Sequence, residues 1–189
     1  MVKESRSGSP ATHVALFRGL NVGRAKRVAM ADLRAMVTGL GYQDVRTLLN
    51  SGNVVFTMTG AARGDPALRI EKALGVELGV SSRVIVLTAE ELTAVVRGNP
   101  LLALATDPSR LLVAVLANPG DRARLEPLAR QDWTPDVLAI GTRASYLWCA
   151  GGILSSRLAA TVGRTLKDAV TTRNWATVTK LHALMENRD

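Results

Sequence analysis

Two series of strand-like and helix-like segments follow each other along the chain in the same order. Continuous or alternating apolar runs predict strands, whereas apolar residues three and four positions apart predict amphipathic helices. The first series has predicted strands at 13–18, 45–49, 54–57 and 83–87, and predicted helices at 30–40, 65–78 and 88–98. The second has predicted strands at 111–116, 137–140, 145–149 and 169–171, and predicted helices at 118–128, 155–167 and 174–185. This repetition predicts a duplicated α+β architecture.

Within each series, strand–helix–strand–strand–helix–strand is followed by one more helix. That order is typical of the split βαβ, or ferredoxin-like, pattern. We therefore predict two tandem ferredoxin-like (βαββαβ) units, each with an extra C-terminal helix. The first unit is expected at 13–100 and the second at 109–189, with a linker between them and a disordered tail at 1–12.

Composition excludes several classes of protein. No apolar run approaches the roughly 18 residues that cross a bilayer, and the first residues lack the hydrophobic region of a secretory signal. Cys149 is the only cysteine, which excludes an intramolecular disulfide, and it is expected to be a small buried hydrophobe. His13 and His182 have no partners at the spacing of metal ligands. We predict a cytoplasmic protein with no metal, no cofactor and no membrane partner.

The charge of the chain favours an anionic partner. The formal net charge is +8, and the excess lies in residues 1–50 and 140–189, whereas the middle of the chain is close to neutral. A basic balance by itself often serves only solubility. Here the cations lie beside glycine-bearing and polar motifs, so a small phosphorylated or carboxylated molecule is the partner that we expect.

The most basic of these motifs follows the first predicted strand. Glycines in a loop allow a tight turn or close approach of a ligand, and basic side chains around such a loop indicate an anion site. The candidate ligand-binding residues here are Arg18, Gly19, Asn21, Gly23, Arg24, Lys26 and Arg27. The spacing matches neither the P-loop nor the dinucleotide-binding glycine pattern. A tight strand-to-helix connection is the alternative interpretation.

Two further polar motifs complete the candidate site. Ser51 and Asn53 lie in a predicted hairpin turn, where the same residues are ordinary for conformational reasons. Thr172, Arg173 and Asn174 precede the last predicted helix, where Thr172 or Asn174 would cap it. Arg173 has no evident capping role, and a cation at a helix N-terminus would favour an anion.

Three segments together resemble a known family. Val14-Ala15-Leu16-Phe17-Arg18-Gly19-Leu20-Asn21-Val22-Gly23, Ser51-Gly52-Asn53-Val54-Val55-Phe56 and Thr172-Arg173-Asn174-Trp175 are similar, in this order, to the family called domain of unknown function 1697. The resemblance implies two ferredoxin-like subdomains and supplies no accepted activity, cofactor or substrate. Asn50 and Ala176 stand where the family commonly has Gln and Asn.

Three functions compete. The first is a binding or regulatory module that holds a small anion between the Arg18–Arg27 loop and the Arg173 motif. The second is nucleic-acid binding through a sheet face, for which only Phe17, Phe56, Tyr146 and Trp148 are available as stacking residues. The third is an enzyme acting on an anionic metabolite, although the nearby carboxylates, Asp32, Asp44 and Asp168, are not paired in the sequence.

Overall fold

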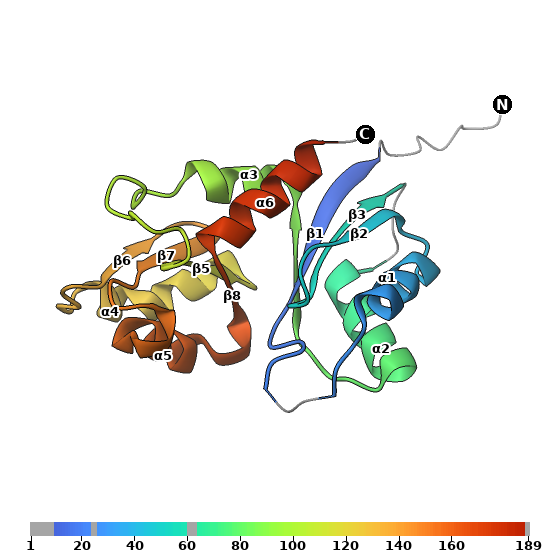
Figure 1. The fold of residues 1–189 in the computed structure, drawn as a ribbon, viewed down its shortest axis with the longest axis horizontal. Helices are drawn as coiled ribbons and strands as arrows, with labels where there is room; N and C mark the ends of the chain where they lie inside the picture. The colour runs from blue at the N-terminus through green and yellow to red at the C-terminus, as the bar shows by residue number, and fades with distance from the viewer. Residues whose placement is uncertain (1–9, 24–25, 60–63, 188–189) are drawn as a thin grey trace. The chain divides into compact units, whose positions relative to one another are not determined.

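The chain divides into two α+β units. The computed structural model describes residues 10–23, 26–59 and 64–187, and the compact units are Met1–Ala89 and Glu90–Asp189. The described residues form two four-stranded antiparallel sheets and six α-helices (Figure 1). The predicted order of strands and helices is confirmed in both halves.

The first unit is a single sheet with two helices. Its elements are β1 (Ala11–Phe17), α1 (Met30–Gly39), β2 (Gln43–Thr47), β3 (Asn53–Met58), α2 (Pro66–Leu78) and β4 (Val84–Thr88). The strands are ordered β2-β3-β1-β4, so β1 pairs with β3 on one side and with β4 on the other. Both central strands are apolar because each is enclosed by neighbouring strands and covered by helices.

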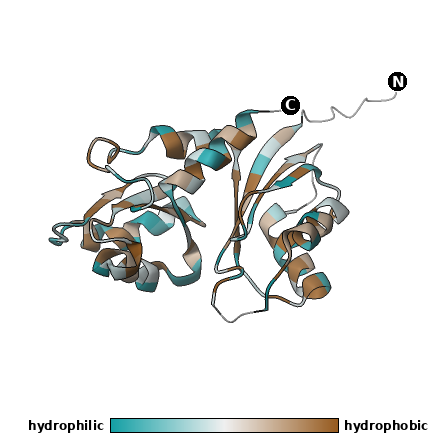
Figure 2. Ribbon diagram, viewed as in Figure 1, coloured by the Kyte–Doolittle hydropathy of each residue, from teal (hydrophilic) through white to brown (hydrophobic). Residues whose placement is uncertain are grey.

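The core of the first unit lies between the sheet and helices α1 and α2. Phe17 and Phe56 from the central strands contact a cluster that includes Leu33 of α1 and Leu74 of α2, all fully buried. Figure 2 shows hydrophobic residues along the strands and on these two helices. Asp65 caps α2 by accepting a hydrogen bond from Ala67 N, at 2.8 Å.

The second unit has helices on both faces of its sheet (Figure 1). Its elements are α3 (Ala89–Arg97), β5 (Leu111–Leu116), the 3₁₀ helix η1 (Pro119–Leu125), α4 (Glu126–Ala129), β6 (Val137–Ile140), β7 (Ala144–Trp148), η2 (Ile153–Ser155), α5 (Arg157–Leu166), η3 (Lys167–Ala169), β8 (Val170–Asn174) and α6 (Trp175–Glu186). The strands are ordered β6-β7-β5-β8, which repeats the order of the first sheet.

One face of this second sheet packs on α4, α5 and η1. Leu147 and Leu116 from the strands are fully buried against Leu125 and Leu158. Cys149 is buried in the same cluster, as expected, and burial raises the pKa of its thiol. A protonated, enclosed thiol is a packing residue rather than a nucleophile.

The division into units falls at Ala89 and Glu90, before the predicted linker at 100–109. Helix α3 therefore belongs to the second unit and is not an extra C-terminal helix of the first. The reason is a contact that the sequence does not reveal: the Tyr146 hydroxyl of β7 donates to Val95 O of α3, at 2.7 Å.

Two predicted boundaries are also corrected. The tail was expected to include residues 11 and 12, but Ala11 and Thr12 belong to β1 because they pair with Met58 and Thr57 of β3. Strand β2 ends at Thr47, two residues before the predicted end, because the following residues form the turn into β3. Among the described residues, no helix is long and apolar enough to cross a membrane.

Candidate functional site

The basic loop that connects β1 to α1 has an unusual backbone. Gly19, Asn21 and Gly23 all have positive φ, at 68°, 59° and 69°. Left-handed residues at alternate positions turn the chain repeatedly in a small space, and asparagine is among the few side chains that tolerate this conformation. A Cβ on Gly19 or Gly23 would meet nothing within 4 Å, so these glycines are needed for their dihedrals and face open space.

Asn21 holds this loop in place. Its Nδ2 donates to Val28 O and to Asn50 O, both at 2.9 Å, and its Oδ1 accepts from Val28 N at 2.7 Å. The amide thus joins the loop to its own far end and to the hairpin between β2 and β3. These bonds use both amide protons and one oxygen lone pair. Asn21 therefore fixes the loop, whatever the loop binds.

The hairpin motif is built for packing. Asn53 is fully buried, and its Nδ2 donates to Leu48 O at 2.8 Å and to Ser51 Oγ at 3.1 Å. Gly52 has φ 73°, and a Cβ there would lie 2.7 Å from Phe17 Cβ. The geometry of Ser51 and Asn53 agrees with the alternative interpretation of a hairpin turn, while their place in a ligand site stays a prediction.

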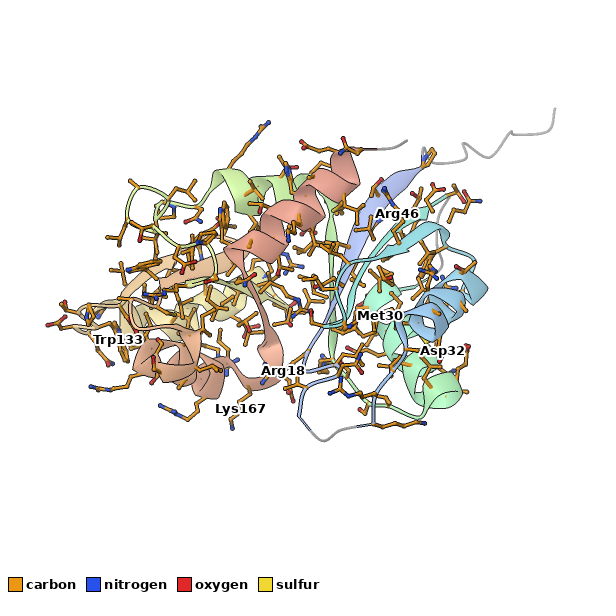
Figure 3. The ribbon with its side chains drawn as sticks, in the orientation of Figure 1. Arg18, Met30, Asp32, Arg46, Trp133 and Lys167 are labelled. Atoms are coloured by element: carbon orange, nitrogen blue, oxygen red, sulfur yellow. The ribbon has the colours of Figure 1, made fainter. Side chains whose placement is uncertain are left out.

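The cations of the loop differ in their surroundings. Lys26 Nζ donates to Leu78 O at the C-terminal end of α2, at 2.8 Å, where a positive charge also suits the helix dipole. Arg27 is exposed. Arg18 lies directly after β1 (Figure 3) and is partly exposed. The predicted binding residue Arg24 lies outside the described residues.

The main chain of the loop offers hydrogen-bond donors. Among the described residues, none accepts a hydrogen bond from the backbone N–H groups of residues 19–23. Successive N–H groups in alternating left-handed conformation form concave sites, called nests, that bind anions. The loop therefore combines positive side chains with N–H donors that have no acceptor in the described part of the chain.

The third motif differs from its predicted setting. Arg173 does not stand at an exposed helix end, because it lies in strand β8 opposite Val113 of β5 and is only 9% exposed. Its Nη1 donates to Thr172 O at 2.8 Å and to Thr171 Oγ1 at 3.2 Å. Burial lowers the pKa of Arg173 to about 10. A buried guanidinium is more costly to charge than an exposed one.

Asn174, by contrast, has the role that the sequence suggested. Its Oδ1 accepts from Thr177 N at 3.0 Å and from Thr177 Oγ1 at 2.7 Å, so it caps α6. Thr172 is partly buried and is not the cap. The two units are described one at a time, and the predicted approach of the Arg18–Arg27 loop to Arg173 stays a prediction.

The residues needed for base stacking are enclosed. Phe17 and Phe56 are fully buried, and Tyr146 and Trp148 are 2% and 8% exposed. Recognition of unpaired bases on a sheet requires aromatic rings that the bases can reach. None of these four rings supports that mode of binding.

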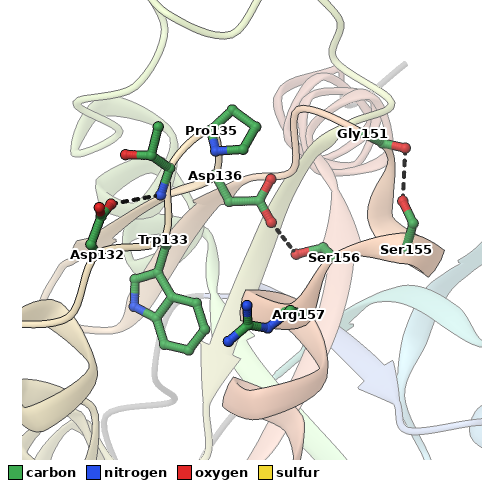
Figure 4. Close-up of a pocket in the computed structure, with 9 residues that line it drawn as sticks. Asp132, Trp133, Pro135, Asp136, Gly151, Ser155, Ser156 and Arg157 are labelled. Atoms are coloured by element: carbon green, nitrogen blue, oxygen red, sulfur yellow. Dashed lines mark hydrogen bonds between the residues drawn. The ribbon is translucent and has the colours of Figure 1, made fainter.

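A small cavity in the second unit was not indicated by any sequence motif. It has a volume of about 240 Å³ and is lined by Trp133, Arg157, Asp136, Ser156 and their neighbours (Figure 4). Asp136 accepts from Ser156 Oγ at 2.6 Å and from Ala150 N at 2.9 Å, and Ser156 Oγ in turn accepts from Ala159 N at 3.0 Å. This Ser–Asp pair caps α5, which is a structural role.

Carboxylates and metal ligands do not gather elsewhere in the described chain. Asp32 lies in the first turn of α1, Asp44 in β2 and Asp168 in η3. The described residues contain no group of three or more His, Cys, Asp or Glu side chains arranged to hold a metal ion.

Comparison with known proteins settles the relationship. A family model described as "Protein of unknown function (DUF1697)" matches residues 11–146. The chain belongs to the DUF1697 family. This confirms the resemblance carried by the three motifs, of which the first two lie within the matched range. No curated protein matches the chain.

One solved structure has the same fold as this chain. The conserved bacterial protein SP0830 from Streptococcus pneumoniae is similar with a TM-score of 0.74 at 21% identity, over 94% of this chain and 99% of that one. A protein described as a putative chlorite dismutase, TA0507, is matched with a TM-score of 0.23 at 15% identity, over 93% and 99% of the two chains. The first likeness concerns the fold alone, and the second is too weak to carry an argument.

Proposed function

We propose that this member of the DUF1697 family is a binding module for a small anionic ligand, and that residues 18–23 with Arg27 form the anion site of the first unit. The observation that carries the proposal is the run of backbone N–H groups at residues 19–23, which have no acceptor among the described residues. Left-handed conformations at alternate residues, here Gly19, Asn21 and Gly23, are the backbone pattern expected of an anion-binding nest.

Preorganisation supports the same function. A flexible loop would lose conformational freedom on binding, at about 1–2 kcal/mol for each residue ordered. The three hydrogen bonds of Asn21 order the loop before any ligand arrives. Arg27 and Arg18 add positive charge near it, which attracts an anion over a longer range.

We also infer that both units are ferredoxin-like. The strand orders β2-β3-β1-β4 and β6-β7-β5-β8, with every neighbouring pair antiparallel, support this topology. In this arrangement the β1-to-α1 loop and the β2-to-β3 hairpin lie at the same end of the sheet. That is where Asn21 bonds to Asn50 O.

The proposal is tested with inorganic phosphate and sulfate as probes. A ligand at about 100 times its dissociation constant stabilises the folded chain by about 2.7 kcal/mol, which thermal denaturation detects as a higher Tm. We expect phosphate to raise the Tm, and Arg27→Gln to weaken the response. Arg34→Gln, which removes an exposed charge from α1, is the matched control.

Salt distinguishes a specific site from general screening of the net charge. The probes are used at low concentration, where exclusion of phosphate from the protein surface adds little to stability. Chloride at the same ionic strength should then give less stabilisation than phosphate, because directed donors at a site favour the oxyanion. Equal Tm shifts with chloride and phosphate, or equal responses from Arg27→Gln and Arg34→Gln, would contradict the proposal.

A further inference from the structure

The second unit contains a larger cavity at one end of its sheet. Its volume is about 380 Å³, within the range of small-molecule sites, which runs from about 300 to 1,000 Å³. It lies between helix α3, the first residue of η1 and the β6-to-β7 turn. The lining residues are Glu91, Ala94, Val95, Gly98, Pro119, Gly141, Thr142, Arg143 and Tyr146.

The wall of this cavity is largely apolar. Ala94, Val95, Pro119 and the ring of Tyr146 supply carbon atoms, and the Tyr146 hydroxyl is already used because it donates to Val95 O at 2.7 Å. Burial raises the pKa of Tyr146 to about 12, so the phenol is neutral in ordinary buffers. An uncharged hydrocarbon group of a ligand would therefore suit this wall.

Two opposite charges stand together at the cavity. Arg143 Nε donates to Glu91 Oε1 at 3.1 Å, with the arginine side chain 15% exposed and the glutamate side chain 40% exposed. Arg143 also donates to Leu116 O and, at 2.8 Å, to Ala117 O. These bonds fix the guanidinium, while the glutamate carboxylate lies nearer the solvent.

We propose that this cavity binds a free α-amino acid with an apolar side chain. The carboxylate of such a zwitterion would lie near Arg143, its ammonium group near Glu91, and its side chain against Ala94, Val95 and Pro119. A ligand with one charge would bring that charge close to the like charge of the Glu91–Arg143 pair. A zwitterion matches both charges, and its short distance between ammonium and carboxylate suits two side chains that are in contact.

This site is independent of the anion site proposed above. It lies wholly in the second unit, uses none of the three sequence motifs, and requires a ligand with no net charge. Loss of the phosphate response in the first unit would leave it untouched, and the reverse also holds.

The first test compares three probes that share one hydrocarbon group. L-Leucine carries both charges, 4-methylpentanoate lacks the ammonium group, and 3-methylbutylamine lacks the carboxylate. Isothermal titration of the full chain should show L-leucine binding at least about tenfold tighter than either analogue, a difference of about 1.4 kcal/mol. Absence of L-leucine binding, or binding of 4-methylpentanoate as tight as that of L-leucine, would overturn the proposal.

Two substitutions assign any binding to this cavity. Ala94 is exposed on α3, so Ala94→Phe should fill the cavity and abolish L-leucine binding while the fold is kept. Ala183→Phe places the same ring at an exposed position of α6 outside the cavity and should leave binding unchanged. Equal binding by wild type and Ala94→Phe, with both folded by circular dichroism, would refute the site.

Glu91→Gln tests the ammonium contact alone. Arg143 keeps its bonds to Leu116 O and Ala117 O in this variant, so the guanidinium stays in place. The affinity for L-leucine should fall at least about tenfold, whereas 4-methylpentanoate should bind as well as before or better. A parallel loss for both probes would show that Glu91 does not face the ammonium group, and would reject the assignment.

Discussion

The connection from β1 to α1 and the connection from β5 to η1 occupy the same place in two sheets of the same strand order, yet they differ greatly in length. The first comprises the twelve residues 18–29, and the second only Ala117 and Asn118. Connections between a strand and a helix commonly need about 2–6 residues. The second unit shows that this fold closes with two, so the fold does not require the longer basic loop.

Both units nevertheless fasten this connection to the neighbouring hairpin. In the first, Asn21 of the connection donates to Asn50 O of the hairpin. In the second, Arg143 of the hairpin donates to Ala117 O of the connection. The same two loops are joined in opposite directions by different side chains. This comparison separates what the sheet end needs from what the first unit adds. The sheet end needs a hydrogen bond between the two loops, and the first unit adds a positively charged loop whose N–H groups at 19–23 have no acceptor among the described residues.

The largest effect is expected at Gly52, whose backbone packs on β1. Gly52→Ala would place a Cβ 2.7 Å from Phe17 Cβ and 2.9 Å from Leu20 Cδ2. Overpacking of a core costs about 1–3 kcal/mol, and an alanine in left-handed conformation adds about 1–2 kcal/mol. Urea denaturation should show the free energy of unfolding falling by the sum of both.

Gly19→Ala is the matched control for this substitution. Gly19 has nearly the same φ, 68° against 73°, but a Cβ there meets nothing within 4 Å. Only the conformational cost of about 1–2 kcal/mol should appear. Equal losses at the two glycines would mean that the hairpin does not pack on β1 as described.

The next effect concerns the hydrogen bonds by which Asn21 joins the β1-to-α1 loop to the hairpin. Asn21→Gly keeps a residue that accepts φ 59° and removes three hydrogen bonds. A net loss of about 0.5–1.5 kcal/mol per bond is usual for intramolecular hydrogen bonds, with the lower values expected at this partly exposed site. Amide hydrogen exchange should quicken at Val28, whose N–H bonds to Asn21 Oδ1. Unchanged hydrogen exchange at Val28 would contradict the conclusion that Asn21 holds the loop in place.

The two tyrosines of the chain give each unit its own titration signal, Tyr42 in the first and Tyr146 in the second. Burial raises the pKa of both phenols, that of Tyr146 to about 12. A raised pKa means that the folded state favours the neutral phenol. The stability that Tyr146 contributes is complete below its ordinary pKa of about 10 and is lost as the pH rises toward 12.

Single-tyrosine variants separate these signals. Phenolate absorbance of Tyr42→Phe should report Tyr146 alone and show a midpoint near 12 while the chain remains folded. Tyr146→Phe should lose less stability than wild type over the same rise in pH, since it has no phenol to ionise there. A midpoint at the ordinary value in folded Tyr42→Phe would contradict the buried position of Tyr146.

The sequence could predict the order of elements because that order depends on local apolar periodicity. It also located the basic loop and the capping residue Asn174, since glycine, charge and cap signals are local. It could not place Arg173 in β8, because that depends on pairing with Val113 of β5. The hydrogen bond from Asn21 to Asn50 O spans 29 positions, and the one from Tyr146 to Val95 O spans 51. Side-chain contacts over such separations are set by packing, which no motif encodes, and the Glu91–Arg143 cavity follows from them.

The smallest effects separate the structural cation of the long loop from the one that we assign to the ligand. Lys26 donates to Leu78 O at the end of α2, so Lys26→Gln should lower the free energy of unfolding by about 0.3–1 kcal/mol and leave much of the phosphate response. Arg27 is exposed and has no hydrogen-bond or ion-pair partner among the described residues, and such surface changes usually stay within about 0.5 kcal/mol. Arg27→Gln should therefore keep the stability and weaken the phosphate response.

Both variants remove one positive charge from neighbouring positions, so a difference between them cannot come from net charge. The opposite pattern, with Arg27 stabilising the fold and Lys26 governing the response, would exchange the two roles. Equal phosphate responses would show that the loop acts only through its total charge. The short connection of the second unit, Ala117 and Asn118, is neutral and has no such effect.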